Sequence, residues 1–331
     1  MRTLRLGVAG LGRIGRIHFN NLARQVPGAI VVAAADPFVE ARAFAEDQGA
    51  ATYASFEELL GHEDLDAIAI CSPTDEHASH VIAAANAQKH IFCEKPLDLS
   101  IDRVRETLEV VESAGVKLML GFNRRFDPHF AKVKALVSEG KVGETHMIRM
   151  TSRDPAPPPI EFIKHSGGLF LDMTIHDFDM ARYLADSEVV EVYARGANLI
   201  DPAIGEAGDI DSAVCVLTFE NGATAVIDNS RQAVYGYDQR VEVFGSKGMV
   251  AIGNETPDRH ELLTVDGVQG PLPQYFFLER YANAYIAEMQ AFVRAIQNDL
   301  PMPVTGHDGL MALKLGLGAK QSAKENRPVK L

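Results

Sequence analysis

The sequence has no tryptophan and only three cysteines, Cys71, Cys93 and Cys215, in 331 residues. The cysteines are far apart and form no C-x-x-C pair, which excludes a disulfide framework and argues against a structural zinc site, so we expect no metal. No apolar run reaches the roughly 18 residues that a membrane-spanning helix needs. We therefore expect a protein of a reducing compartment, the cytoplasm, with no membrane span.

Basic side chains are also in the minority. Lys and Arg total 32 against 45 Asp and Glu, which gives a net charge of −13 with neutral His. This balance argues against nucleic acid as a partner, because a nucleic-acid surface needs clustered basic side chains. It also argues against a polybasic membrane anchor. Hydrophobic residues make up 47% of the chain, which is enough for a core, and the length suits about two domains.

The first 121 residues alternate between short apolar runs and segments with helical spacing. The apolar runs are Leu4–Ala9, Ile30–Ala35, Ala67–Cys71, His90–Cys93 and Lys117–Gly121. The helical segments between them are Ile14–Gln25, Val39–Gln48, Glu76–Gln88 and Ile101–Ala114. Continuously apolar strands separated by helices predict a parallel sheet covered on both faces. We therefore assign residues 1–121 to a doubly wound α/β domain.

After about Phe122 the pattern changes to alternating strands with a few helices. The alternating segments are Glu144–Arg153, Glu188–Asn198, Ser212–Glu220, Ala223–Arg231 and Gln239–Phe244. Helices are expected at Pro128–Glu139, Gly168–Leu184, Glu279–Asn298 and His307–Lys324. This pattern predicts a second, α+β domain over residues 122–331 with a large, mostly antiparallel open sheet. The last helix, about residues 305–324, is a candidate to pack back on the first domain.

A glycine-rich turn, Gly10-Leu11-Gly12-Arg13-Ile14-Gly15, links the first predicted strand to the first predicted helix. In such a G-x-G-x-x-G turn the glycines allow a tight bend, close approach of a pyrophosphate and close packing of helix on strand. The helix N-terminus offers unpaired N–H groups to phosphate. Asp36 ends the second strand roughly 20 residues further on, where a carboxylate binds both ribose hydroxyls and repels a 2′-phosphate. The motif in this context predicts a Rossmann domain that binds NAD rather than NADP.

Later strand ends add further candidates, because ligands of open α/β sheets bind beyond the carboxyl ends of the strands. Ser72, Pro73 and Thr74 follow one strand, and His77 lies on the same edge, although plain turn and N-cap chemistry explains Ser72 and Thr74 equally well. The candidate cofactor-binding residues are Gly10, Gly12, Arg13, Ile14, Gly15, Asp36, Ser72, Pro73, Thr74, His77, Glu94 and Lys95.

Two segments carry candidate catalytic groups. Lys95 follows a strand and precedes Pro96, which restricts it to extended geometry, and its ammonium is suited to stabilise an alkoxide. Asp172 and His176 have i, i+4 spacing in an apolar segment, which puts both on one face of a predicted helix, and His is the natural base near neutral pH. The alternative for Lys95 is a surface salt bridge. The alternatives for the pair are a core histidine bonded to an aspartate and a zinc site, which no cysteine pair or second His cluster supports.

Three more residues are candidates for substrate contact. Arg124 lies at the domain junction, where it could bind a hydroxylated substrate or brace the junction through Asp127. Asp154 begins a proline-rich loop that could form a stiff wall, and Tyr235 could offer its phenol hydroxyl or end an ordinary strand. The candidate substrate-binding residues are Lys95, Arg124, Asp154, Asp172, His176 and Tyr235.

With these motifs assembled, the chain resembles the Gfo/Idh/MocA family, the glucose–fructose oxidoreductase and inositol dehydrogenase group, over essentially its whole length. The glycine-rich turn, the Glu94-Lys95-Pro96 tripeptide and the Asp172/His176 pair occur in the family's order and spacing. Arg153–Pro159 and Met173–Arg182 further resemble the inositol 2-dehydrogenases. The resemblance implies an NAD-binding Rossmann domain, a C-terminal domain with an open sheet, and homotetramers built through that sheet.

The resemblance also implies a reaction: NAD-dependent oxidation of a ring hydroxyl of a cyclic polyol, with myo-inositol and 2-keto-myo-inositol (scyllo-inosose) as the expected pair. In this mechanism His176 takes the hydroxyl proton, Lys95 stabilises the alkoxide, and Asp172 holds His176 or a neighbouring hydroxyl. Arg124 and Tyr235 are similar in position to substrate contacts of the family. The open alternatives are scyllo-inositol, D-chiro-inositol or an aldose such as glucose as substrate, an NAD-dependent glycosidase, and a non-catalytic NAD-binding regulator.

Overall fold

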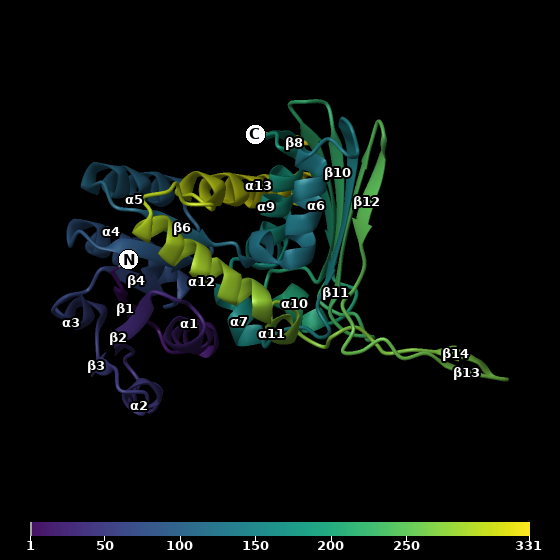
Figure 1. Ribbon diagram of the computed structural model, residues 1–331. Coiled ribbons are helices and arrows are strands. Elements are labelled where there is room, and N and C mark those ends of the chain that lie inside the picture. The colour runs from purple at the N-terminus through teal and green to yellow at the C-terminus, as the bar shows by residue number, and fades with distance from the viewer. Residues whose placement is uncertain (1) are drawn as a thin grey trace. The chain divides into compact units, whose positions relative to one another are not determined.

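The structure, a computed structural model, describes residues 2–331. Its backbone packs into two compact units (Figure 1). The first unit contains the residues up to Phe126 together with Ala284–Met311, and the second contains Asp127–Asn283 and Ala312–Leu331. Within residues 2–331, no helix combines the length and the apolar character needed to cross a membrane.

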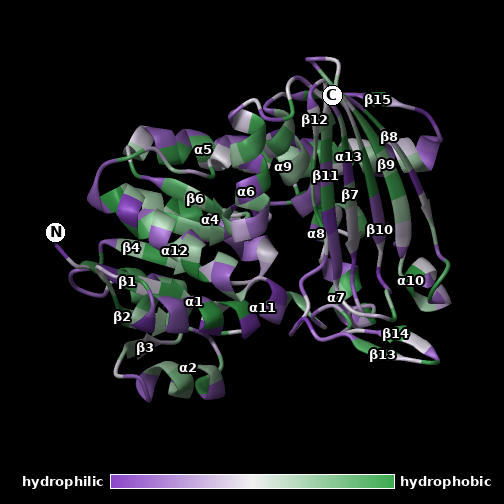
Figure 2. Cartoon of the chain, turned by 45° about the vertical axis from the view of Figure 1, so that its right-hand side comes forward, coloured by the Kyte–Doolittle hydropathy of each residue, from purple (hydrophilic) through white to green (hydrophobic). Residues whose placement is uncertain are grey.

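The first unit is built on a six-stranded parallel sheet with strand order β3-β2-β1-β4-β5-β6. The strands are β1 (Leu4–Ala9), β2 (Ala29–Ala35), β3 (Ala51–Tyr53), β4 (Ala67–Ile70), β5 (His90–Glu94) and β6 (Leu118–Gly121). Every residue of β4 and β6 is buried, and Figure 2 colours these strands as hydrophobic. Burial on both faces explains their continuously apolar sequence. The predicted doubly wound α/β domain is confirmed.

Helices cover both faces of this sheet. They are α1 (Arg13–Arg24), α2 (Val39–Glu46), α3 (Phe56–Leu60), α4 (Thr74–Asn86), α5 (Ile101–Ala114), the short 3₁₀ helix η1 (Asn123–Phe126) and most of α12 (Ala282–Gln297). Since each crossover between parallel strands is right-handed, α1 and α2 lie on one face and α3, α4 and α5 on the other. On the first face the ring of His18 in α1 contacts that of Tyr285 in α12, with ring centroids 5.6 Å apart. The sequence analysis did not predict β3 or α3.

The second unit contains a seven-stranded mixed sheet with strand order β12-β11-β7-β10-β9-β8-β15. Its strands are β7 (Thr145–Arg153), β8 (Val189–Ala197), β9 (Ser212–Phe219), β10 (Thr224–Ser230), β11 (Asp238–Gly245), β12 (Gly248–Ile252) and β15 (Val329–Lys330). A small hairpin pairs β13 (Leu262–Thr264) with β14 (Gly267–Gln269). Only the β7–β10 pair is parallel among the described strands of the large sheet. The predicted mostly antiparallel open sheet is therefore confirmed.

Burial alternates along the strands of this sheet, as expected when one face is covered. In β7, for example, Ile148 and Met150 are buried whereas Met147 and Arg149 are exposed. The helices of the unit are α6 (Pro128–Ser138), α7 (Ile160–His165), α8 (Leu169–Asp172), α9 (Thr174–Ala185), α10 (Pro202–Glu206), α11 (Phe277–Arg280) and, from Ala312 onward, α13 (Gly306–Glu325). Among these, α6 and α9 pack on strands of the sheet.

The prediction of one continuous helix over Gly168–Leu184 is wrong, because the chain breaks at Met173 between α8 and α9. The hydroxyl of Thr174 donates to Asn229 Oδ1 at 2.7 Å and lies 3.3 Å from the carbonyl oxygen of Leu169. These contacts anchor the start of α9 to β10. The helical spacing of the sequence could not predict this break, because the hydrogen bond of Thr174 is to a residue 55 positions away. The predicted helix Glu279–Asn298 is likewise divided at Tyr281 into α11 and α12.

An ion pair within the first unit ties η1 to the start of α13. Arg125 Nη2 lies 2.9 Å from Asp308 Oδ1, and both side chains are largely buried. Burial by itself would raise the pKa of Asp308, but the charge of Arg125 and hydrogen bonds from Thr305 lower that pKa to about 2. Because an unfolded Asp titrates near 3.9, the ionised carboxylate stabilises the fold above about pH 4, and this contribution is lost as the pH falls toward 2.

We expect Asp308→Asn to lower the free energy of unfolding at neutral pH by about 1–2 kcal/mol, after allowance for solvent screening. The difference from the wild type should shrink as the pH falls below about 4, because the wild-type carboxylate is then protonated as well. Urea unfolding at a series of pH values measures both quantities. A difference that stays constant with pH would contradict this account of the ion pair.

Candidate active site

The turn between β1 and α1 needs its glycines for different physical reasons. Gly10 has φ +84°, and a Cβ on it would lie 2.5 Å from the carbonyl oxygen of Cys71. A Cβ on Gly15 would lie 1.8 Å from the carbonyl oxygen of Gly10. Gly12 differs, since no described atom lies within 4 Å of its Cβ position, and it is the N-cap residue of α1. This open space beside the unpaired N–H groups of the first helical turn fits a dinucleotide pyrophosphate.

Asp36 lies at the end of β2 and is tied to this turn. Its Oδ2 accepts from the backbone N–H of Leu11 at 2.7 Å, and its Oδ1 accepts from that of Phe38 at 2.9 Å. Each oxygen keeps a further lone pair for a ribose hydroxyl. Arg42, which the sequence analysis did not consider, donates to the backbone carbonyls of Asp36 and Pro37 at 2.7 and 3.0 Å. The strand end therefore presents the carboxylate of Asp36, while the guanidinium of Arg42 is bound to backbone carbonyl oxygens.

The loops after β4 and β5 are joined by His77, which is only 2% exposed. Its Nε2 lies 2.8 Å from the carbonyl oxygen of Ser72, and its Nδ1 lies 2.8 Å from that of Pro96. His77 therefore connects two loops of the edge that was predicted to bind the cofactor. Ser72 Oγ lies 2.9 Å from His80 Nδ1, while Thr74 begins α4.

Glu94 ends β5, and Lys95 follows it with partial exposure. Glu94 Oε1 lies 2.7 Å from Nε2 of the fully buried His18, so its carboxylate faces α1. A Cβ on Gly121 would lie 2.9 Å from Glu94 Oε2, which shows how closely β6 passes. The peptide bond between Lys95 and Pro96 is cis. At the turn itself, Arg13 is exposed and Ile14 is half-buried at the start of α1.

In the second unit, Asp172 and Asp154 lie around one buried guanidinium. Arg231, 1% exposed, places its Nη1 3.0 Å from Asp172 Oδ2 and 3.9 Å from Asp154 Oδ2. Its Nη2 lies 3.8 Å from Asp209 Oδ2. Asp172 ends α8 and His176 lies in the first turn of α9, both half-buried. Three carboxylates thus share one positive charge, and one of them, Asp172, lies four residues before the predicted base in the chain.

The starts of α8 and α9 are held by polar side chains from other elements. Asp209 accepts from the backbone N–H of Leu169 at 3.0 Å, and a Cβ on Gly168 (φ +88°) would come within 2.6 Å of that carboxylate. Asn229 of β10 accepts from Thr174 and donates to Asp177 Oδ2 at 2.8 Å. Side chains from distant parts of the chain therefore orient the two short segments that carry Asp172 and His176.

The sequence analysis missed Arg231 and Asp209. Arg231 ends the segment that was predicted as a strand, directly after β10, and an arginine in that place carries no special pattern. Its partner Asp172 is 59 positions away, so only the folded chain shows the pair.

Two further candidates, Tyr235 and Arg124, lie on other elements than Asp172 and His176. The hydroxyl of Tyr235 donates to Asp238 Oδ2 at 2.6 Å and accepts from Arg153 Nη1 at 3.2 Å. Burial, followed by the hydrogen bond to Asp238, raises the pKa of Tyr235. Arg124 belongs to η1 of the first unit and is buried.

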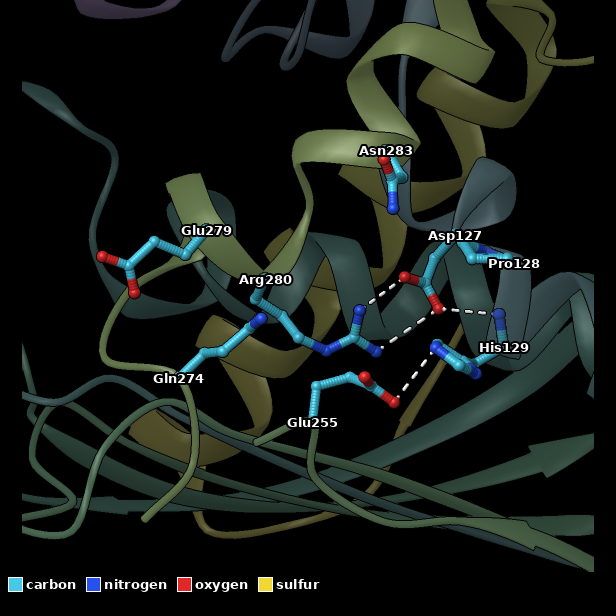
Figure 3. Close-up of a pocket in the computed structure, with 8 residues that line it drawn as sticks. All are labelled: Asp127, Pro128, His129, Glu255, Gln274, Glu279, Arg280 and Asn283. Atoms are coloured by element: carbon cyan, nitrogen blue, oxygen red, sulfur yellow. Dashed lines mark hydrogen bonds and ion pairs between the residues drawn. The ribbon is translucent and has the colours of Figure 1, made fainter. Parts of the chain in front are cut away.

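A polar pocket in the second unit contains none of the predicted site residues. Figure 3 shows its lining residues, which are Asp127, Pro128, His129, Glu255, Gln274, Glu279, Arg280 and Asn283. Arg280 points at Asp127, with Nη2 3.3 Å from Oδ1, and His129 Nε2 lies 3.0 Å from Glu255 Oε1. These pairs connect the start of α6 with α11 and with the loop after β12. We interpret the pocket as structural.

The glycine turn and Asp36 at the carboxyl edge of a parallel, doubly wound sheet are typical of one class of protein, the dinucleotide-dependent oxidoreductases. Comparison with known families agrees. A family model described as "Oxidoreductase family, NAD-binding Rossmann fold" matches residues 4–122, and one described as "GFO/IDH/MocA C-terminal domain" matches residues 130–251. The chain therefore belongs to the Gfo/Idh/MocA family of oxidoreductases, and NAD is its cofactor.

Individual relatives are similar over their full length. The chain is 50% identical to the myo-inositol 2-dehydrogenase of Thermotoga maritima, over 99% of this chain and 98% of that protein. It is 47% identical to the inositol 2-dehydrogenase of Rhizobium meliloti, over 99% of each chain. It also resembles the crystal structure of a Lactobacillus casei scyllo-inositol dehydrogenase with bound NAD(H) and scyllo-inositol, with a TM-score of 0.93, 34% identity and 99% coverage of each chain. These findings confirm the family resemblance stated from the sequence.

Gly12→Ala should weaken NAD binding by about tenfold or more without loss of stability, because the new methyl group meets no protein atom and occupies the approach of a pyrophosphate. NAD titration by calorimetry and thermal unfolding measure the two effects.

Gly15→Ala is the matched control, since there the methyl group collides with the backbone of Gly10. This variant should lose stability. If Gly12→Ala were destabilised to the same degree, or bound NAD as the wild type does, the assignment of the pyrophosphate site would be wrong.

Arg231→Met should lower the free energy of unfolding by about 3 kcal/mol, because it leaves three half-buried carboxylates without their cation. Arg149→Met is the comparison, since Arg149 is 65% exposed and lies 3.6 Å from Glu242. Removing that exposed pair should cost less than about 0.5 kcal/mol. Equal losses for the two variants in urea unfolding would argue against a central role for Arg231.

Proposed function

We propose that the protein oxidises a ring hydroxyl of a cyclic polyol with NAD⁺, and that its substrate is myo-inositol, which becomes 2-keto-myo-inositol (scyllo-inosose). The observation that carries this proposal is the full-length similarity, at 47–50% identity, to two relatives named for inositol 2-dehydrogenase activity. The second candidate is scyllo-inositol, which is favoured by the 34% identical structure that holds it. The lower identity of that relative makes myo-inositol the first choice.

The cofactor, when bound, supplies the hydride acceptor. His176 takes the proton of the reacting hydroxyl, and Lys95 stabilises the oxyanion that develops as the proton leaves. Asp172 holds His176 or a neighbouring hydroxyl, and its negative charge favours the protonated imidazole that forms. Arg231 keeps the Asp172 carboxylate in place through the 3.0 Å contact. These roles for Lys95, Asp172 and His176 rest on their chemistry and on the family motifs that they match.

The charges around Arg231 favour a neutral, polyhydroxylated substrate. Asp154, Asp172 and Asp209 together exceed the single charge of Arg231 by two, so the group is acidic. Ionised carboxylates only accept hydrogen bonds and therefore suit substrates that are rich in hydroxyl donors. An anionic substrate would meet repulsion there. We assign Asp154 to substrate binding on this basis and keep Arg124 and Tyr235 as further candidates.

NADH formation in a panel of inositols and aldoses, with NAD⁺ and again with NADP⁺, tests the proposal. We expect the highest kcat/KM with myo-inositol and NAD⁺, since Asp36 repels the 2′-phosphate of NADP⁺. Activity only on another polyol or aldose would keep the chemistry and overturn the substrate. If NAD binds but no compound of the panel gives NADH, an NAD-dependent glycosidase or a non-catalytic NAD-binding regulator would be favoured.

Lys95→Ala should lower kcat by at least about a hundredfold while the Kd for NAD changes by less than about fivefold, because the ammonium acts on the reacting oxygen. Steady-state kinetics and NAD titration on the same preparation measure the two effects. Unchanged turnover would remove Lys95 from the mechanism.

We further propose a cytoplasmic homotetramer with no nucleic-acid or membrane partner. The exposed face of the large sheet carries apolar side chains that a second copy would cover, including Met147, Val214 and Phe244. The buried free thiols suit a reducing compartment, and the charge of −13 disfavours nucleic acid. Size-exclusion chromatography with light scattering should give the mass of a tetramer, and a monomer would overturn the assembly.

A further inference from the structure

Glu288 in α12 is a buried titratable group for which the proposed mechanism has no use. Glu288 is 0% exposed, and neither of its carboxyl oxygens has a hydrogen-bond partner within residues 2–331. Burial, followed by the charge of Glu94, raises the pKa of Glu288 well above its usual range. An ionised carboxylate without partners would be very costly in such a place. These conditions favour the neutral carboxylic acid, whose O–H needs an acceptor.

The ring of His18 in α1 offers a free acceptor nitrogen of the kind that Glu288 needs. Its ring is fully buried, and Nε2 lies 2.7 Å from Glu94 Oε1. Because a carboxylate oxygen accepts, Nε2 is the donor in this contact, and Nδ1 of that tautomer carries a lone pair. Nδ1 is also buried, and no donor reaches it from the described chain. One neutral acid lacks an acceptor and one imidazole nitrogen lacks a donor.

The packing of α12 brings these two groups to the same place. The ring of Tyr285 lies 5.6 Å from that of His18, and the ring of Phe292 lies 6.0 Å from that of Phe92. Phe92 in turn lies 5.0 Å from His18. Glu288 follows Tyr285 by three residues and precedes Phe292 by four, so it occupies the same helix face between them. Its carboxyl therefore enters the layer that contains His18.

We propose that Glu288 is a positioning residue for Lys95: its neutral carboxyl is linked to Nδ1 of His18 through one bridging water, while His18 Nε2 donates to Glu94. Asn21, one turn after His18, adds a buried Nδ2 without a partner in the described chain, so a bridging water would find several polar contacts. Each donor in this series has an acceptor, which fixes the Glu94 carboxylate next to Lys95 in the chain. The proposal rests on the role of Lys95 in the proposed function.

Infrared spectroscopy of the holoenzyme in D₂O reads the protonation state of Glu288 without any substrate. The wild type at neutral pH should show the carbonyl stretching band of a protonated carboxylic acid, and Glu288→Gln should lack it. If the two spectra do not differ in that band, Glu288 is ionised and the proposal is overturned.

Kinetics test the link to Lys95. Glu288→Leu has no donor for His18, and kcat should fall about tenfold, as expected for the loss of one hydrogen bond in a buried network. KM and the Kd for NAD should change less than about twofold, because neither ligand is touched. Glu288→Gln offers an amide donor and should recover most of the turnover. Met289→Leu, a swap of similar volume at the next buried position, controls for repacking.

A purely structural role predicts a different result. Replacement of a buried acid by leucine often leaves stability unchanged or raises it, so thermal unfolding of Glu288→Leu should not follow its kcat. Equal turnover of the Leu and Gln variants would overturn the positioning role. If the wild type oxidises no polyol, the proposed function fails and the link to Lys95 fails with it, whereas the infrared band still decides whether Glu288 is the neutral acid.

Discussion

The first turn of α1 passes so close to the end of β1 that a methyl group on Gly15 would lie 1.8 Å from the carbonyl oxygen of Gly10. This approach fixes the direction in which α1 leaves the sheet. The helix N-terminus then opens at Gly12, where nothing in the described chain would contact a Cβ, and the opposite side of the helix carries His18 to Glu94. One steric constraint therefore affects both the glycine turn and the contact between His18 and Glu94.

In the second unit the organising constraint is electrostatic. A buried guanidinium must have its charge balanced, and Arg231 obtains this from carboxylates that belong to separate segments. Those segments include the end of α8, where Asp172 lies, and the loop after β7, where Asp154 lies. Because the acids outnumber the cation, the group carries a net negative charge. The proposed preference for a neutral, polyhydroxylated substrate therefore rests on the same ion pairs that connect these segments.

The sequence predicts the parts of this arrangement that leave a local pattern. Continuously apolar runs indicate the central parallel strands, and the glycine spacing indicates the turn. The four-residue spacing of Asp172 and His176 assumed one helix, whereas the two residues lie in α8 and α9, and their catalytic roles stay a prediction. Three features could not be predicted, because each depends on contacts between distant segments. They are the helix break at Met173, the pairing of Arg231 with Asp172, and the placement of Glu288 near His18. The strands that were not predicted, β3, β12, β13, β14 and β15, contain two to five residues, which is short for a periodic signal.

The most direct test of the account follows the hydride itself. Myo-inositol that carries deuterium on the ring carbon bearing the reacting hydroxyl would be oxidised with NAD⁺, and the reduced cofactor and the ketone would be analysed by mass spectrometry. The account predicts one deuterium in each molecule of NADH formed and none at the carbonyl carbon of the product. Deuterium that appears in the solvent, or stays on the sugar while the cofactor is reduced, would contradict direct oxidation of that carbon.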